Sequence, residues 1–201
     1  LRKRHRQASG RCLLEGLRLI EDAWRSGVAP DPLFYLPETA AHHVGLQSLV
    51  VRLTEAGVEC LACTPPVLAA MAETTTPQGV VAVVSLPMLP IPPRLSLLLL
   101  LDGVRDPGNL GTLLRTAEAA GVELALLAPD TVDASNGKVL RGAMGAHFRL
   151  PIRSCSDWNE VARILAPIPR LYVAEAAAEL AYDQVDWCLP AALIVGGESD
   201  G

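Results

Sequence analysis

The sequence predicts an α/β protein of two domains, and three observations lead to that prediction. Short apolar segments alternate with segments of helical periodicity along most of the 201 residues, as in sheets whose strands are joined by helices. Apolar residues make up 50% of the chain, enough for a hydrophobic core in each of two small domains. Four prolines fall within residues 85–94, a composition typical of an extended linker. We therefore expect domains at residues 1–85 and 95–201, joined by a linker over residues 86–94.

The first expected domain is a small α/β unit. Leu13, Leu17, Ile20 and Trp24 recur at helical spacing, and Gly27 follows as a stop, which predicts an amphipathic helix over residues 13–27. The segments after it predict a strand in residues 31–37, a helix in 45–57, a strand in 58–64, a helix in 65–73 and a strand in 79–87.

The second expected domain continues the alternation around a more buried sheet. Residues 95–103 are apolar at consecutive positions, as in a parallel strand that helices cover on both faces. Further strands are expected in residues 122–129, 148–154, 170–176 and 190–201, and helices in 109–121, 135–147 and 156–166. Strands and helices that alternate at such short spacing predict a doubly wound parallel sheet.

The net charge and the lengths of the apolar segments indicate which partners, nucleic acid or membrane, the protein could bind. The net charge of −5 argues against a protein that coats nucleic acid without specificity. However, 7 of the 17 basic residues lie in the first 25 positions, which leaves open a solvated tail or a local nucleic-acid contact. Apolar runs such as Leu97–Leu101 are far shorter than the roughly 20 residues that span a bilayer. We expect no membrane partner.

The cysteines favour free thiols over a metal site. Cys60 and Cys63 have the spacing of half a zinc site, but the sequence has no second such pair. We therefore expect buried free thiols and no metal. Five cysteines without a disulfide framework suit a reducing compartment, so the expected location is the cytoplasm, with an organellar matrix as the alternative.

Ligands of doubly wound sheets bind outside the carboxyl ends of the strands, and a first candidate loop lies at residues 105–111. Gly108 and Gly111 are expected to permit unusual backbone geometry there, and Asn109 is expected to cap the helix that follows.

In that helix Leu110, Leu113, Leu114 and Ala117 predict a buried stripe. Arg115 and Glu118 then lie on another side. A solvent-exposed pair between them remains an alternative to a functional role for Arg115.

A second candidate loop follows the last strand. Gly196 and Gly197 let backbone groups approach a flat ligand, and Glu198 supplies a charge. Neither loop matches a dinucleotide fingerprint or a P-loop. The residues themselves thus predict an α/β enzyme whose ligand lies at these two loops.

Five segments together resemble one known family, the SpoU (TrmH-type) RNA ribose 2′-O-methyltransferases of the SPOUT superfamily. "DGVRDPGNLGTLLRTAEAAG" looks like the family's first motif, "KVLRGAMGAHFRLPI" like the segment after it, and "LIVGGESDG" like its second motif. "GRCLLEGLRLIEDAWRSG" and "TTTPQGVVAVV" are similar to its substrate-binding module, a small α/β domain related to RNA-binding ribosomal proteins. The resemblance covers nearly the whole chain.

The resemblance implies a methyltransferase that uses S-adenosylmethionine and carries a trefoil-knotted C-terminal α/β domain. It implies catalytic roles for Asn109, Arg115 and Glu198, and cofactor contacts at Gly196, Gly197, Glu198 and Gly201. A guanidinium keeps its proton, with a pKa above about 12, so we favour Arg115 as a hold on an RNA phosphate over Arg115 as a base. The group that accepts the proton of the ribose hydroxyl stays open.

The resemblance also implies RNA contacts and a quaternary structure. The residues expected to contact RNA are Arg2, Lys3, Arg4, Arg6, Arg115 and Arg141. Ribosomal RNA is favoured over transfer RNA, and the full-length protein is expected to be a homodimer. The family's third motif, which closes the knot and the cofactor pocket, is expected after Gly201. A non-catalytic RNA-binding or ribosome assembly factor is the alternative function.

Overall fold

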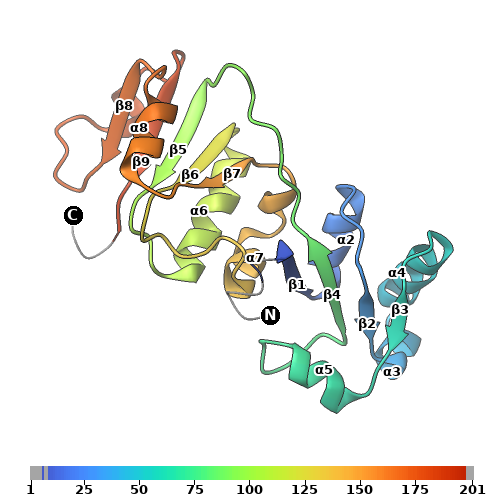
Figure 1. Ribbon diagram of the computed structural model, residues 1–201. Coiled ribbons are helices and arrows are strands. Elements are labelled where there is room, and N and C mark those ends of the chain that lie inside the picture. The colour runs from blue at the N-terminus through green and yellow to red at the C-terminus, as the bar shows by residue number, and fades with distance from the viewer. Residues whose placement is uncertain (1–5, 7–8, 198–201) are drawn as a thin grey trace.

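The first half of the chain forms a four-stranded mixed sheet. The computed structural model describes residues 6 and 9–197. The elements of the first half are β1 (Arg11–Glu15), α2 (Leu17–Arg25), β2 (Leu33–Tyr35), α3 (Pro37–His42), α4 (Val44–Glu55), β3 (Cys60–Ala62), α5 (Pro65–Met71) and β4 (Val80–Ser85). The strand order is β1-β4-β2-β3, in which only β2 and β3 run parallel (Figure 1).

The start of this domain corrects the prediction of one helix over residues 13–27. A strand, β1, precedes the helix, and α2 begins only at Leu17. Gly16 separates them with a φ of 95°, which no helix contains. All five residues of β1 pair with β4, and Cys12 and Leu14 are fully buried in the core of this domain. Pairing with a strand about 70 residues away therefore outweighs the local helical spacing of Leu13.

The second half forms a five-stranded sheet in which every neighbouring pair is parallel. Its elements are β5 (Leu97–Leu101), α6 (Pro107–Ala119), β6 (Leu124–Leu127), α7 (Gly137–Ala143), the 3₁₀ turn η1 (Ala146–Phe148), β7 (Ile152–Ser154), α8 (Trp158–Leu165), β8 (Arg170–Ala174), the 3₁₀ turn η2 (Tyr182–Gln184) and β9 (Ala191–Val195). The strand order β7-β6-β5-β9-β8 places β5 at the centre. The predicted α/β fold with a parallel C-terminal sheet is confirmed.

The central strand explains the run of five leucines. Leu99 and Leu101 pack with α6 and α7 on one face of the sheet, whereas Leu98 and Leu100 pack with α8 on the other. Successive side chains of a strand point to opposite faces, so a strand covered on both sides must be apolar at every position.

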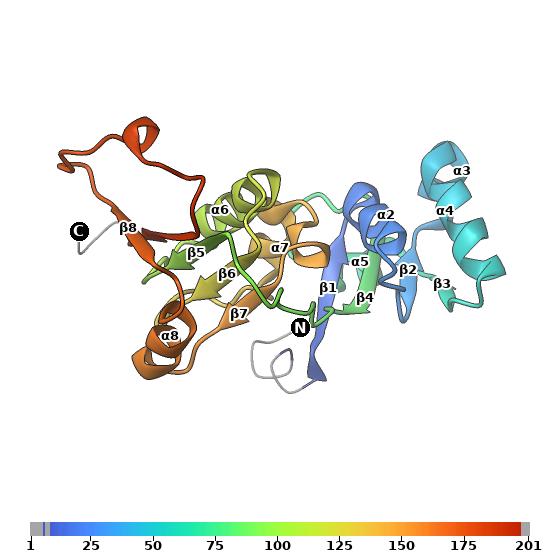
Figure 2. The same ribbon diagram turned by 90° about the horizontal axis from the view of Figure 1, so that it is seen from above.

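The two domains meet along α7 and β1, which lie side by side in both views (Figures 1 and 2). Leu140 of α7 and Phe148 of η1 are buried within the hydrophobic core of the first domain. Residues 86–96, between β4 and β5, contain no helix or strand. The first domain is thus held against the second by shared core packing as well as by the connecting segment.

Candidate functional site

The first candidate loop ends in a capped helix, and the cap differs from the predicted one. Asp106, not Asn109, is the N-cap of α6: its Oδ1 accepts a hydrogen bond from the backbone N–H of Asn109 at 2.9 Å. That backbone hydrogen bond is the main cause that lowers the pKa of Asp106, and Lys138 contributes through an ion pair at 3.3 Å. Pro107 occupies the first turn, where its missing N–H costs nothing. The side chain of Asn109 is therefore not needed as the cap.

The motif glycines act through close packing and not through unusual backbone angles. Gly108 and Gly111 lie inside α6, and the left-handed glycine of this loop is Gly103, with a φ of 61°. A Cβ on Gly111 would stand 2.8 Å from the carbonyl oxygen of Val139 and 2.9 Å from the Cα of Gly142. The prediction of unusual backbone geometry at Gly108 and Gly111 was wrong. Gly111 is required for another reason, because a side chain there would force α6 away from α7.

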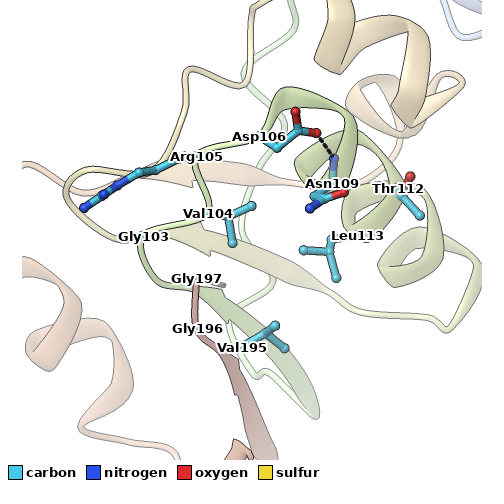
Figure 3. A pocket seen from close by; sticks show the side chains of 10 residues that line it. All are labelled: Gly103, Val104, Arg105, Asp106, Asn109, Thr112, Leu113, Val195, Gly196 and Gly197. Carbon is cyan, nitrogen blue, oxygen red and sulfur yellow. Dashed lines mark hydrogen bonds between the residues drawn. The ribbon is translucent and has the colours of Figure 1, made fainter. Parts of the chain in front are cut away.

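A pocket of about 560 Å³ lies where the loops after β5 and β9 meet (Figure 3). Its lining residues are Gly103, Val104, Arg105, Asp106, Asn109, Thr112, Leu113, Val195, Gly196 and Gly197. We call it the loop pocket. The structure thus brings together Asn109, Gly196 and Gly197, which the sequence predicted, at the carboxyl ends of two adjacent parallel strands.

Main-chain atoms form much of the wall of the loop pocket. A Cβ on Gly197 would stand 2.5 Å from the carbonyl oxygen of Gly103, so the two loops touch through their main chains. A Cβ on Gly196 would have no atom within 4 Å, so its backbone is open to the pocket. Val104 and Leu113 provide apolar surface, and Figure 3 shows both side chains beside the gap between the loops.

Six of the lining side chains were not assigned to a ligand site from the sequence: Val104, Arg105, Asp106, Thr112, Leu113 and Val195. Leu113 was assigned to the buried stripe, although it is only partly buried and lines the loop pocket. The spacing of Thr112 and Leu113, three and four residues after Asn109, was the available signal, because residues three and four apart share a helix face.

Arg115 lies outside the loop pocket but on the same ridge of α6. Asn109, Thr112 and Arg115 follow one another at intervals of three residues, and all three are exposed. The predicted alternative pair of Arg115 with Glu118 does not form: Glu118 accepts a hydrogen bond from Arg149 at 2.8 Å. Nη1 of Arg115 instead contacts Sδ of Met144 at 3.3 Å. The ridge thus leads from the loop pocket toward the first domain.

Two of the arginines predicted to contact RNA are engaged within the chain. Arg6 is 9% exposed and forms an ion pair with Asp133 at 2.9 Å and a hydrogen bond with Ser135 at 3.2 Å. Arg6 was expected to contact RNA; the structure instead buries it against the second domain, where it pairs with Asp133. Arg141 forms ion pairs with Glu15 at 3.5 Å and with Glu73 at 3.4 Å.

Other predicted residues lie outside the described part of the chain. They are Arg2, Lys3 and Arg4 of the basic start, and Glu198 and Gly201 of the second loop. All five cysteines are free, and Cys60 and Cys63 are half-buried, less buried than expected. Within residues 6 and 9–197, no group of three or more His, Cys, Asp or Glu side chains is arranged to hold a metal ion. No helix in that part is long and apolar enough to cross a membrane.

The fold and the loop pocket define an α/β domain with a ligand site at its strand ends, preceded by a smaller accessory domain. Family models match both parts: SpoU rRNA Methylase family over residues 96–201 and MRM3-like substrate binding domain over residues 1–82. The chain belongs to the SpoU rRNA methylase family.

Relatives are found in bacteria and mitochondria. The chain is 33% identical to 23S rRNA (guanosine(2553)-2′-O)-methyltransferase RlmP of Bacillus subtilis over 199 residues, which cover 99% of this chain and 76% of the relative. It is 36% identical to the mitochondrial rRNA methyltransferase 3 of Homo sapiens over 184 residues, which cover 85% of this chain and 41% of the relative. The chain thus spans about two fifths of the length of the human relative.

Solved structures share the whole arrangement. The SpoU methyltransferase AviRb from Streptomyces viridochromogenes, in complex with AdoMet, matches with a TM-score of 0.82 and 28% identity over 100% of this chain and 78% of that chain. The AdoMet-bound rRNA methyltransferase from Sinorhizobium meliloti matches with a TM-score of 0.82 and 27% identity over 100% of this chain and 76% of that chain. The likeness therefore includes both domains and the way they are joined.

Proposed function

We propose that this protein transfers the methyl group of S-adenosylmethionine to a ribose 2′-hydroxyl of ribosomal RNA. The observation that carries the proposal is the loop pocket, where Asn109, Gly196 and Gly197 meet at the carboxyl ends of β5 and β9. The membership of the family supports the reaction type. RlmP and the mitochondrial relatives are rRNA methyltransferases, which supports ribosomal RNA over transfer RNA as the substrate and an enzyme over a non-catalytic assembly factor.

The residues of the loop pocket fit S-adenosylmethionine. Its volume of about 560 Å³ is within the range of about 300–1,000 Å³ for small-molecule sites. Val104, Leu113 and Val195 offer apolar surface to the adenine ring of the cofactor. The exposed main chain at Gly196 offers hydrogen-bond donors and acceptors. When bound, the cofactor supplies a methyl group on a positively charged sulfur. We propose that Gly196, Gly197, Glu198 and Gly201 contact it, and that Glu198 orders the second loop.

Arg115 is proposed to hold the RNA and not the cofactor. It lies on the ridge that leaves the loop pocket, and its guanidinium contacts a thioether, which leaves its charge available. A guanidinium fork can bind a phosphate in a bidentate manner and so orient the neighbouring ribose. We propose that Asn109 positions the mouth of the pocket and that Arg115 fixes the attacking hydroxyl relative to it.

The N-terminal domain is proposed to bind structured RNA. Its match to an MRM3-like substrate binding domain supports this role. Arg2, Lys3 and Arg4 are proposed as phosphate contacts, with Arg141 at the domain boundary. Arg6 is assigned to the ion pair with Asp133 instead.

We further infer a homodimer in a reducing compartment. Apolar side chains on and beside the edge strand β8 are exposed, among them Leu171 at 51% and Val173 at 63%, and such a surface is typical of an interface. The five free cysteines support the cytoplasm or an organellar matrix. The trefoil knot, closed by a third motif, stays a prediction.

Transfer of a radiolabelled methyl group tests the proposed function. The natural full-length protein is incubated with labelled S-adenosylmethionine and transcripts of ribosomal RNA, with transfer RNA in parallel. Label in ribosomal RNA that requires Arg115 supports the proposal. Label in transfer RNA alone would reassign the substrate, and cofactor binding without transfer to any RNA would favour the assembly factor.

A further inference from the structure

A second cavity, of about 490 Å³, lies between the two domains. Arg18, Asp22 and Gln78 line it from the first domain, and Arg141, Met144 and Arg149 line it from the second. We call it the interdomain cavity. It is distinct from the loop pocket, with which it shares no lining residue. Its volume also falls within the range of about 300–1,000 Å³ for small-molecule sites.

Ion pairs hold two of its three arginines in place. Arg149 Nη1 contacts Asp22 of the first domain at 2.9 Å and its Nε contacts Glu118 of α6 at 2.8 Å. Arg141 is held by Glu15 and Glu73, as described above. The contacts with Asp22, Glu15 and Glu73 cross the domain boundary, so the cavity has fixed walls and is not a gap between independent domains.

Arg18 differs from these two arginines. Its side chain is exposed on α2, and it forms no ion pair with any of the described residues. Arg25, at the end of the same helix, is paired with Glu21 at 3.7 Å and does not line the cavity. The charge that the cavity offers to a ligand is therefore that of Arg18.

Met144 connects the cavity to the proposed catalytic ridge. It adopts a left-handed conformation with a φ of 46°, uncommon for a residue with a side chain, and is 56% exposed. Its sulfur contacts Arg115, and its side chain lines the cavity. A large apolar side chain held in the open by an uncommon backbone conformation indicates a contact with a ligand.

We propose that the interdomain cavity binds one nucleotide of the RNA, next to the nucleotide whose ribose Arg115 positions. The base packs on the thioether of Met144, and its phosphate pairs with the guanidinium of Arg18. Unstacked bases pack on flat side chains, the thioether of methionine makes favourable contacts with aromatic rings, and arginine forks bind phosphates. The inference rests on the proposed function, because it takes RNA as the ligand and Arg115 as the neighbouring contact.

Variants of Arg18 test the inference through RNA binding in the absence of cofactor. Fluorescence anisotropy with labelled transcripts of ribosomal RNA compares Arg18→Ala and Arg18→Lys with Arg25→Ala in the full-length protein. We expect Arg18→Ala to weaken binding about tenfold, Arg18→Lys to recover only part of it, and Arg25→Ala to stay within about twofold. Equal losses for Arg18→Ala and Arg25→Ala, or no loss in either, would overturn the inference.

A second variant addresses the apolar wall. Met144→Gly removes the side chain and suits the left-handed backbone, so it keeps the fold. We expect a rise of about fivefold or more in the KM for RNA, with the Kd for S-adenosylmethionine within twofold. An unchanged KM in Met144→Gly would contradict the proposed base contact. If the wild type transfers no methyl group but Arg18→Ala alone weakens RNA binding, the proposed reaction fails while the binding site stands.

Discussion

Nη1 of Arg115 lies 3.3 Å from Sδ of Met144, across the contact between α6 and the turn that follows α7. The nearest carboxylate along α6 is that of Glu118, and it is occupied by Arg149. Arg115 forms no ion pair with any residue in the described part of the chain, so its charge is oriented without being neutralised. This arrangement suits a guanidinium that must bind a phosphate of an incoming RNA.

Arg115→Ala is expected to lower the turnover of methyl transfer about 100-fold or more. The loss of a contact that positions the reacting hydroxyl acts on the transition state, and Arg115 does not line the loop pocket. The Kd for S-adenosylmethionine, measured by calorimetry, should therefore stay within about twofold. Arg163→Ala, an exposed arginine on α8, is the matched control. Turnover within threefold of the wild type would contradict the role of Arg115.

Gly111→Ala is expected to destabilise the second domain by about 1–3 kcal/mol. The added methyl group would collide with the backbone of Val139 and Gly142, which cannot yield without separating α6 from α7. The free energy of unfolding in urea measures the effect. Thr116→Ala, on the exposed side of the same helix, should change it by less than about 0.5 kcal/mol. Equal stabilities of the two variants would show that the helices can move apart freely.

Local patterns were sufficient to predict most elements of the fold. The spacing of apolar residues within Leu97–Leu101, and of Leu110 and Leu114 within the following helix, was enough to predict which side chains are buried. The strand β1 was missed because Leu13 fits a helical spacing and only β4, far along the chain, makes it a strand. The helix cap was assigned to Asn109 because several capping residues stand together there, and only the backbone angles select Asp106.

The candidate site was predictable where loops of a single domain form it, and not where residues of both domains do. Gly196, Gly197 and Asn109 follow directly from the rule that ligands bind at strand carboxyl ends. Arg6 and Asp133 lie more than 120 positions apart in the sequence, so no local sequence pattern predicts that they form a buried pair. The interdomain cavity could not be predicted either, because its lining residues come from distant parts of the sequence.

Arg6→Gln is expected to lower the free energy of unfolding by about 2–4 kcal/mol. It leaves the carboxylate of Asp133, whose side chain is only 16% exposed, without its guanidinium partner. Arg11→Gln removes an exposed pair with Asp31 and should cost less than about 1 kcal/mol. The double variant Arg6→Gln/Asp133→Asn should recover part of the loss, because it removes the unpaired charge. Full stability of Arg6→Gln alone would show that the pair contributes nothing to the fold.

His147 is expected to make stability depend on pH between about 6.5 and 4. Burial lowers its pKa from 6.5 to about 4, although its Nε2 donates to the carbonyl oxygen of Ala134 at 2.9 Å. In this interval the unfolded chain binds a proton that the folded chain does not, so stability is fully present above pH 6.5 and falls as the pH falls.

The contribution of His147 amounts to about 3 kcal/mol between pH 7 and pH 4. It is measured as the difference between wild type and His147→Gln in urea unfolding at several pH values, because carboxylates contribute equally to both proteins. His147→Gln should show the shallower pH dependence. Parallel pH profiles for the two proteins would mean that His147 is protonated equally easily in the folded and unfolded states.

The proposed methylation of a ribose 2′-oxygen can be measured directly on the RNA product. Ribosomal RNA transcripts treated with the full-length protein and S-adenosylmethionine are digested to nucleosides and analysed by mass spectrometry. We expect a 2′-O-methylated nucleoside that is absent with Arg115→Ala and unaffected by Arg163→Ala. Methyl groups found only on the bases, or no methylated nucleoside with a wild type that binds both the cofactor and the RNA, would contradict it.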